Sequence, residues 1–250
     1  MELKEFFAHN PKAAIAFSGG VDSAYLLYAA VKYGANVKAY YVKSPFQPQF
    51  ELKDAKRLAA GLGVEMEIIK LDVLENGCIA SNQPERCYHC KRAILSAIIE
   101  KAAADGYTLL LDGSNASDDA ADRPGMKALA ELSVRSPLRD CGLTKKMIRK
   151  LSLDAGLFTH DKPAYACLAT RIPTGEAITK EKLEATERAE EYLSTLGFKN
   201  FRVRLFKGSA RLQLTKNDMP KAVAHADKIN HELKKYYASV MLDLEARDEQ

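Results

Sequence analysis

Short apolar runs alternate with longer amphipathic segments over the first two thirds of the chain. The run at 13–17 stops at a Gly-Gly pair, and residues 23–33 then carry apolar side chains at helical spacing until Gly34. The same order recurs, with strands expected at 37–42, 64–71 and 107–111 and helices at 50–62, 90–104 and 144–155. Strands separated by helices of this length predict βαβ units and an α/β fold with a doubly wound parallel sheet.

The pattern starts afresh after a stretch rich in Pro, Gly and Thr at 162–175. The expected elements that follow are a helix, two strands, a helix and a strand, at 179–195, 201–206, 210–214, 219–237 and 239–244. This αββαβ order predicts a smaller C-terminal α+β domain. We therefore expect one domain at 1–175 and a second at 176–250.

Composition narrows the class of protein without naming a function. The 250 residues are 47% hydrophobic and 28% charged, with a net charge of +4, which is typical of a globular protein. That charge is too small to indicate a nucleic-acid or membrane partner by itself. The N-terminus lacks a signal-peptide pattern, and no apolar run approaches the ~20 residues of a membrane span. We expect a cytoplasmic protein.

Cysteine is the most informative residue type in the composition. The five cysteines are an odd set, which does not suggest a disulfide framework: Cys78, Cys87, Cys90, Cys141 and Cys167. Cys87 and Cys90 form a C-x-x-C sequence at the start of an expected helix, and Lys91 and Arg92 follow. A helix N-terminus and neighbouring cations both favour a thiolate. Reduced, chemically active thiols are therefore expected, with Cys78 and Cys141 as bystanders.

Several interpretations of the C-x-x-C remain open from the residues alone. A redox pair normally follows the first strand of a thioredoxin-like order, which this chain lacks. A structural zinc site needs four ligands, and Cys87, Cys90 and Cys167 supply three, with His89 poorly placed to join them. Three thiolates and one open position suit a [4Fe–4S] cluster. The remaining interpretation is ordinary thiols without a shared function.

The strongest motif lies between the first strand and the first helix. It consists of Ser18, Gly19, Gly20, Val21, Asp22 and Ser23. Glycines let backbone N–H groups converge, and the helix N-terminus adds about half a positive charge, so the motif predicts a phosphate site. An acid at Asp22 is compatible with phosphate when Mg²⁺ bridges the two. The Walker lysine motif and the G-x-G-x-x-G fingerprint are both absent from the sequence. A tight turn with a serine cap is the structural alternative.

This six-residue pattern resembles that of the PP-loop ATP pyrophosphatases, in which S-G-G-x-D-S holds the β,γ-pyrophosphate of ATP. Within that group the chain resembles the LarE family of ATP-dependent sulfur transferases. The matching stretches, in order, are 16–23, 43–45, 86–91, 111–115, 122–127, 134–138 and 161–171. The second domain matches in element order and, more weakly, at 201–204. As a set, these stretches are far more specific than the loop alone.

The resemblance implies a reaction. A carboxylate of pyridinium-3,5-biscarboxylic acid mononucleotide, derived from nicotinate, is adenylated and pyrophosphate leaves. A sulfur nucleophile then displaces AMP, which gives the thiocarboxylate of the nickel-pincer cofactor. One type of member sacrifices the sulfur of a cysteine at the position of Cys167, whereas another holds a [4Fe–4S] cluster on three cysteines. Because Cys87, Cys90 and Cys167 are all present, the resemblance implies the cluster type, with ATP and Mg²⁺ as further cofactors and Cys167 and Asp22 as catalytic residues.

Further site residues follow from position and resemblance. Lys43 and Ser44 end the second strand, where an adenine ring is expected in this topology, and Gly113 ends the fourth strand at the same crevice, with a plain turn as the alternative. The candidate substrate-binding residues are Arg171, Glu190, Arg202 and Arg204. Arginine forks match phosphate and carboxylate groups. Arg202 and Arg204 alternate along a strand and share one face, although an exposed strand face is the other interpretation.

Three rival functions remain to be separated. A PP-loop tRNA thiolase would carry a basic RNA-binding surface, whereas the first helix of the second domain is acidic. An ammonia-using synthetase would need none of the three cysteines, and a nucleotide sensor would release no pyrophosphate. The expected partner is therefore a small anionic mononucleotide, without a nucleic acid or a membrane. The resemblance also implies a homo-oligomer built from trimers.

Overall fold

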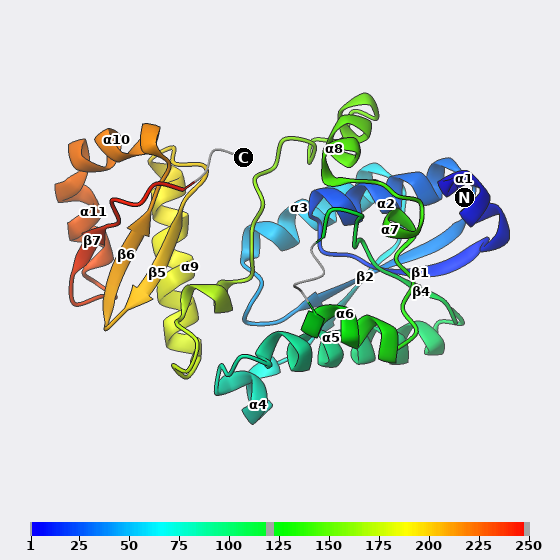
Figure 1. Cartoon of the computed structure of the whole chain (residues 1–250), viewed down its shortest axis with the longest axis horizontal. Helices are drawn as coiled ribbons and strands as arrows, with labels where there is room; N and C mark the ends of the chain where they lie inside the picture. Colours follow the sequence, from blue (N-terminus) through cyan, green and yellow to red (C-terminus); the bar gives the residue numbers. More distant parts are fainter. Residues whose placement is uncertain (1, 119–122, 248–250) are drawn as a thin grey trace. The chain divides into compact units, whose positions relative to one another are not determined.

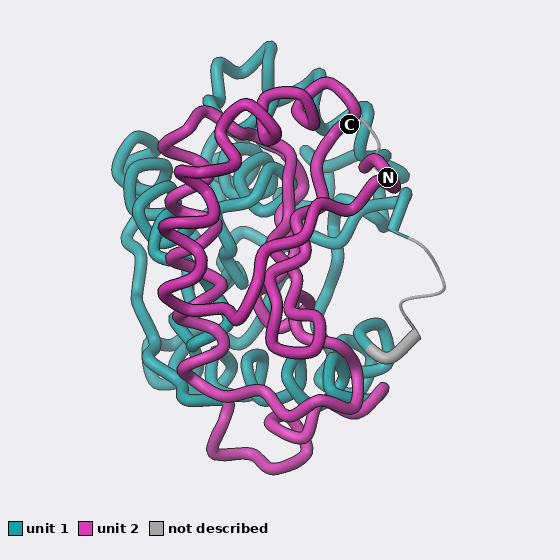
Figure 2. The backbone as a smooth tube through the Cα atoms, turned by 90° about the vertical axis from the view of Figure 1, so that its left-hand side faces the viewer, with its two compact units in different colours: residues 1–73, 85–162 teal, residues 74–84, 163–250 magenta. Residues whose placement is uncertain are grey.

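The computed structural model describes residues 2–118 and 123–247, and these form two compact units (Figure 2). The first unit is Met1–Val73 with Glu85–Lys162, and the second is Leu74–Pro84 with Pro163–Gln250. Residues 163–175, which the sequence placed with the first domain, thus pack in the second unit. Asp122, which begins the stretch 122–127 named above, lies outside the described residues.

The first unit contains a parallel sheet of four strands in the order β3-β2-β1-β4. The strands are β1 (Lys12–Ala16), β2 (Asn36–Lys43), β3 (Met66–Lys70) and β4 (Leu110–Leu111). Ile15 at the centre of the sheet pairs with Ala39 of β2 on one side and Leu111 of β4 on the other. The predicted parallel α/β fold is confirmed, although β4 is shorter than expected.

Helices cover both faces of this sheet (Figure 1). They are α1 (Leu3–His9), α2 (Val21–Lys32), α3 (Gln49–Gly61), α5 (Arg86–Ala104), α6 (Arg123–Glu131), α7 (Pro137–Asp140) and α8 (Lys145–Asp154). One apolar cluster packs α1, α2, α3 and α8 on one face, and another packs α5 and α6 on the opposite face. The sequence pattern missed α1, α6 and α7, because four to nine residues give too little periodicity to recognise. Over the described residues, no helix is long and apolar enough to cross a membrane.

The second unit contains a three-stranded sheet in the order β5-β6-β7. Its elements are η1 (Val73–Glu75, which begins in the first unit), α4 (Gly77–Ala80), η2 (Leu168–Arg171), α9 (Lys180–Thr195), β5 (Arg202–Phe206), β6 (Ser209–Gln213), η3 (Lys216–Asp218), α10 (Met219–Ala224), α11 (Ala226–Leu233) and β7 (Val240–Leu242). Lys207 and Gly208 form the β5–β6 turn with φ of 49° and 77°, as a tight hairpin requires. The expected helix 219–237 is two helices, because the backbone of His225 (φ −104°, ψ 15°) departs from helical values.

The segment 74–84 belongs to the second unit through hydrogen bonds to residues 172–178. The buried Asn82 adopts a left-handed backbone (φ 56°), and its amide nitrogen donates to the carbonyls of Pro173 (2.8 Å) and Glu176 (3.0 Å). Gly175 N donates back to the Asn82 carbonyl at 2.9 Å. These contacts join residues about ninety positions apart in sequence, which no local pattern predicts.

Candidate functional site

The phosphate loop follows β1 and leads directly into α2. Gly20 is the N-cap residue, and Gly19 has a φ of 73°. The Ser23 hydroxyl closes the loop: it accepts from Ser18 N (3.3 Å), donates to the Gly20 carbonyl (3.2 Å) and lies 3.0 Å from the Ser18 hydroxyl. The first N–H groups of α2 have no intrahelical partner and add to the positive end of the helix dipole. The loop is therefore built to hold an anion.

Two glycines let neighbouring segments press against this loop. A Cβ on Gly19 would lie 3.0 Å from the Cβ of Ala55 in α3. A Cβ on Gly113, in the segment after β4, would lie 2.9 Å from the backbone nitrogen of Ser23. Real Cβ contacts are essentially never as short as that at Gly113, and at Gly19 the contact is tight and the φ of 73° disfavours a side chain, so both positions favour glycine. The structure thus brings Gly113 to the N-terminus of α2, and its predicted part in cofactor binding stays a prediction.

Asp22 is the acid of the loop, and Lys145 is its partner. Lys145 Nζ, from the first residue of α8, lies 2.5 Å from Asp22 Oδ2. Burial raises the pKa of Asp22, and the bond to Lys145 offsets this only in part. The other oxygen, Oδ1, is buried and has no hydrogen-bond partner among the described residues. A buried carboxylate oxygen without a partner fits a ligand of Mg²⁺, which prefers oxygen ligands.

Lys145 was not singled out from the sequence. The signal that could have found it is its place directly after Thr144, the N-cap of α8, whose side chain accepts from Met147 N. The start of α8 was expected there, but no local pattern connects residue 145 to residue 22.

The segment after β4 lies against the start of α2, beside the phosphate loop. Asp112 is buried and accepts hydrogen bonds from Ser114 Oγ (2.6 Å) and Ser136 Oγ (2.5 Å). Lys91 Nζ, from α5, lies 4.0 Å from its carboxylate. β1 and β4 are neighbours whose connections leave in opposite directions along the sheet. This is the topological switch point at which ligands bind in open α/β sheets.

Lys43 and Ser44 lie at the carboxyl end of β2, on the same edge of the sheet as the phosphate loop. Both hold the turn that follows. Lys43 Nζ donates to the Gln47 carbonyl, and Ser44 Oγ donates to Gln47 Oε1 at 2.7 Å. Ser44 is buried. Their contacts shape the turn in which an adenine was expected, and adenine binding by these side chains stays a prediction.

Cys87 and Cys90 lie on α5, which begins at Arg86 and not at Cys90 as the sequence suggested. Residues three apart on a helix lie on one face, so the two side chains leave α5 on the same side. Arg86 Nη2 lies 3.3 Å from Cys87 Sγ, within hydrogen-bond reach of sulfur. Tyr88 Oη donates to Glu131 Oε2 at 2.6 Å, which ties this end of α5 to α6. Cys87 is exposed and Cys90 half-buried.

Cys167 lies in the second unit, immediately before η2. Arg171, four residues later, has a fully buried side chain. Its Nη1 donates to the carbonyls of Ala166 (2.9 Å) and Cys167 (3.4 Å) and to Thr170 Oγ1 (2.8 Å). Arg171 therefore fixes the backbone around Cys167.

Glu190 of α9 completes this arrangement. Its carboxylate accepts from Arg171 Nε (2.8 Å) and Nη2 (3.1 Å), from Tyr165 Oη (2.6 Å) and from Val203 N (3.0 Å). It is 6% exposed, and its partner Arg171 is 0% exposed. Both were expected to bind the substrate. Within this unit they bind one another, and a direct contact of either with the substrate stays a prediction.

Arg202 and Arg204 share one face of β5, as the alternation predicted. Arg202 Nη2 donates to the Ala164 carbonyl, and Arg204 Nη1 donates to the Thr170 carbonyl at 2.6 Å. Burial, aided by the charges of Arg171 and Arg247, lowers the pKa of Arg202 to about 10 and also lowers that of Arg204. Both guanidiniums donate to neutral carbonyl and amide oxygens, so the cluster carries more positive than negative charge.

The cysteines do not assemble a metal site within a single unit. None of the five, all within the described residues, forms a disulfide, and Cys87 and Cys90 lie in the first unit whereas Cys167 lies in the second. Within neither unit, over residues 2–118 and 123–247, do three His, Cys, Asp or Glu side chains come together to hold a metal ion. A cluster on these three cysteines therefore stays a prediction.

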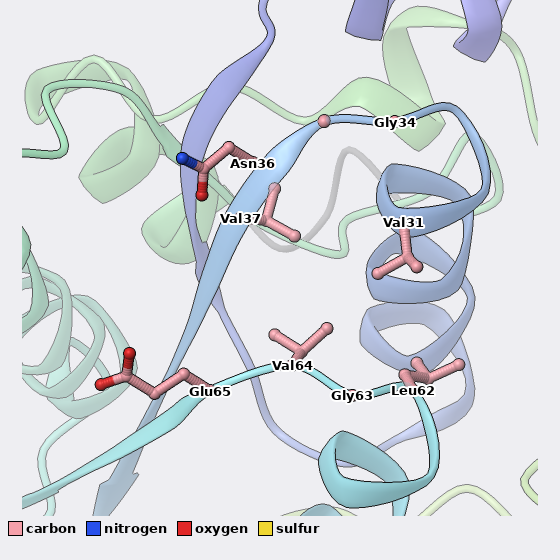
Figure 3. Close-up of a pocket in the computed structure, with 9 residues that line it drawn as sticks. Val31, Gly34, Asn36, Val37, Leu62, Gly63, Val64 and Glu65 are labelled. Carbon is pink, nitrogen blue, oxygen red and sulfur yellow. The ribbon is translucent and has the colours of Figure 1, made fainter.

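A surface cavity of about 350 Å³ lies elsewhere in the first unit (Figure 3). Its lining comes from the end of α2, the start of β2 and the turn before β3, and includes Val31, Asn36, Val64 and Glu65. These are the amino ends of the strands, whereas the phosphate loop follows a carboxyl end. Its lining includes one ionisable side chain, Glu65, and none of the phosphate-loop residues 18–23.

Comparison with known proteins agrees with this geometry. Residues 12–91 match the family described as queuosine biosynthesis protein QueC. A pyridinium-3,5-bisthiocarboxylic acid mononucleotide synthase of Lactiplantibacillus plantarum is 32% identical over 236 residues, which are 93% of this chain and 86% of that protein. An uncharacterized protein of Synechocystis is 40% identical over a region that is 85% of this chain and 80% of that protein. A tRNA-specific 2-thiouridylase of Thermotoga petrophila is 27% identical over a region that is 60% of this chain and 54% of that protein.

Proposed function

The chain belongs to the family of pyridinium-3,5-bisthiocarboxylic acid mononucleotide synthases, and we propose that it is an ATP-dependent sulfur transferase acting on the corresponding biscarboxylic mononucleotide. A substrate carboxylate oxygen attacks the α-phosphorus of ATP, and pyrophosphate leaves. The resulting acyl adenylate is a mixed anhydride with AMP as a good leaving group, so a sulfur nucleophile displaces AMP and the sulfur stays in the product as a thiocarboxylate. The product serves nickel-pincer cofactor biosynthesis.

The phosphate loop carries this proposal. It offers the N–H groups of the α2 N-terminus to pyrophosphate at the switch point of the sheet. Asp22, one buried oxygen of which has no hydrogen-bond partner in the described part of the chain, would hold Mg²⁺ there, and the ion would offset the charge of the leaving pyrophosphate. Lys145 supplies a second cation at the same place.

The arginine cluster of the second unit supports an anionic substrate. Glu190 pairs with Arg171, which leaves Arg202 and Arg204 bound to neutral oxygens. Burial, together with the positive charges of Arg171 and Arg247, lowers the pKa of both, so an anion beside them would be favourable. The phosphate or the carboxylates of the mononucleotide would supply that charge.

The three cysteines Cys87, Cys90 and Cys167 suit the donor set of a [4Fe–4S] cluster with one iron not bound by the protein. When bound, such a cluster carries a labile sulfide on that iron. The alternative source is the Cys167 sulfur itself, which would leave dehydroalanine at position 167.

Pyrophosphate release tests the adenylation. We expect release that depends on the biscarboxylic mononucleotide and on Mg²⁺, and that is lost in Asp22→Asn. Release without the mononucleotide, or none with it, would contradict the proposed substrate. The matched control is Asp54→Asn, whose carboxylate pairs with Lys162 and not with the loop.

Iron and sulfide analysis separates the two sulfur sources. The chain purified without oxygen should be brown and hold about four irons, and Cys87→Ser, Cys90→Ser or Cys167→Ser should each lose them. Cys141→Ser is the control and should keep them. A colourless chain without iron, but with a mass loss of one H₂S at Cys167 after turnover, would replace the cluster by sacrificial transfer.

A PP-loop tRNA thiolase is the second candidate, favoured by the similarity to the tRNA-specific 2-thiouridylase. Four glutamates of α9 are at least partly exposed, at 181, 184, 187 and 191, which does not favour an RNA-binding surface there. Filter binding of bulk tRNA at physiological salt should show no retention, whereas tight retention would favour the thiolase.

The resemblance implies the assembly, whereas the location is a prediction from the composition and sequence pattern. We expect a homo-oligomer built from trimers, in the cytoplasm. Light scattering after size exclusion measures the mass, and a monomer at micromolar concentration would contradict the oligomer.

A further inference from the structure

Three arginine side chains hold the loop 164–171, which carries Cys167. Four carbonyls of this loop accept from them: Ala164 from Arg202, Ala166 and Cys167 from Arg171, and Thr170 from Arg204. Backbone carbonyls of an irregular loop usually bond water or neighbouring backbone. Here guanidiniums replace those partners, so the path of the loop depends on where the arginines are held.

Glu190 determines where the central arginine is held. Its two oxygens face the Nε and Nη2 edge of Arg171, which is a fork-to-fork geometry that fixes the guanidinium plane. Glu190 Oε1 also accepts from Val203 N of β5, and Oε2 accepts from Tyr165 Oη of the loop. One carboxylate of α9 therefore joins the helix, the sheet and the loop.

We infer that the Glu190–Arg171 pair is the positioning device of Cys167, holding its loop so that the thiol keeps one place. All three guanidinium nitrogens of Arg171 are hydrogen-bonded and the side chain has no exposed surface, so its contacts are with Glu190 and the loop, and not with solvent. Buried ion pairs seldom make a protein more stable than apolar packing would. What this pair contributes is therefore the fixed geometry of the Arg171 guanidinium. Arg171 and Glu190 are thus positioning residues that act on the reaction by holding Cys167. The inference rests on the proposed part of Cys167 in sulfur delivery.

The test uses the full chain with Cys167 as its single cysteine, obtained by replacing Cys78, Cys87, Cys90 and Cys141 with Ser. This background cannot hold a three-cysteine cluster, so the result does not depend on the sulfur source. The rate at which an aromatic disulfide reagent labels Cys167 at fixed pH reports how far the loop opens. Glu190→Gln is the main variant, and Glu191→Gln, one residue further and exposed, is the matched control.

In Glu190→Gln we expect labelling of Cys167 to become about tenfold faster, because Arg171 loses its fork and releases the carbonyls of Ala166 and Cys167. Tyr165→Phe removes one hydrogen bond and no charge, so it keeps the fold and should accelerate labelling about threefold. Glu191→Gln should match the parent. Thermal melts of every variant accompany the rates. Unchanged labelling in Glu190→Gln and Tyr165→Phe, or in Tyr165→Phe alone where Glu190→Gln does not fold, would overturn the inference.

A kinetic measurement on the wild-type background separates positioning from substrate binding. A positioning pair predicts that Tyr165→Phe lowers kcat while the KM for the mononucleotide stays unchanged. A substrate ligand would instead raise that KM. Absence of thiocarboxylate product in the parent chain would contradict the proposed function and leave the labelling result standing.

Discussion

The phosphate loop and the Cys167 loop are constructed in opposite ways. The phosphate loop is held by contacts within its own six residues: the Ser18 and Ser23 hydroxyls hydrogen-bond across it, and α2 starts within it. The Cys167 loop has η2 as its local structure, and its carbonyls are held by Arg171, Arg202 and Arg204. A loop of the first kind can be recognised in six residues, whereas a loop of the second kind depends on elements up to 38 positions away.

This difference has a functional consequence. Pyrophosphate binding needs fixed N–H groups, which glycine and a helix N-terminus supply without long side chains. Delivery of sulfur needs one atom held at one place, and a cysteine in an irregular loop obtains that only from tertiary contacts. We therefore expect the first site to be broken most easily by added bulk and the second by removed charge.

Gly113→Ala should have the largest effect on the first site. The new Cβ would lie 2.9 Å from Ser23 N and displace the start of α2. We expect ATP affinity to fall about 100-fold, at a cost of about 1–3 kcal/mol in the free energy of unfolding. Isothermal titration with ATP and Mg²⁺ measures the affinity. Gly61→Ala is the control, because a Cβ at that helical position meets nothing within 4 Å. Equal affinities in the two variants would contradict a loop made by close backbone packing.

Lys145→Ala should weaken MgATP binding about tenfold, because the Lys145 ammonium is both a cation beside the pyrophosphate and the partner of Asp22. Lys146→Ala, at the exposed neighbouring position, should bind as the parent does. Lys145→Arg keeps the charge and should recover part of the affinity. If Lys145→Ala bound MgATP like the parent, the phosphate loop would need no side chain from a distant element. It would then differ even more from the Cys167 loop, which depends on distant arginines.

The pH dependence of MgATP binding should follow Asp22. Its pKa is raised above the ordinary 3.8, and Mg²⁺ binds the ionised carboxylate, so affinity stays constant above the raised pKa and falls as the pH drops through it. The free energy of unfolding without Mg²⁺ depends on pH in the opposite direction. The contribution of Asp22 to it is present below pH 3.8 and is lost as the pH rises through the raised pKa. Titrations between pH 4 and 8 measure the first effect. A parent and Asp22→Asn with the same pH profile would contradict it.

The two helix caps should give the smallest effects and compare the units directly. Thr144 caps α8 of the first unit, and Thr179 caps α9 of the second, each accepting a backbone N–H at 3.4 Å. Thr144→Ala and Thr179→Ala should each cost about 1 kcal/mol in the free energy of unfolding, measured by urea denaturation. Thr144→Ala should also weaken MgATP binding slightly through Lys145, and Thr179→Ala should not. If both variants changed MgATP binding equally, the inference that α8 acts on the phosphate loop through Lys145 would be contradicted.

The fold was largely predictable where periodicity is long. Residues 36–43 and 86–104 repeat their apolar positions often enough to identify a strand and a helix, and the glycines after the helices mark their ends. The helices α6 and α7 and the membership of 74–84 in the second unit were not predictable. They depend on contacts such as that of Asn82 with Pro173, between residues 91 positions apart.

By itself, the sequence determined the parallel α/β order, the phosphate loop with its acid, the place of Gly113 and the set of three cysteines. These features are local, since a strand, a turn and a helix N-terminus are specified by adjacent residues. The tertiary structure alone decided that Lys145 faces Asp22 and that Glu190 and Arg171, expected as ligands of the substrate, bind one another beside Cys167. The physical reason is that a buried charge must find its partner wherever the fold brings one, and the distance along the chain does not limit that choice.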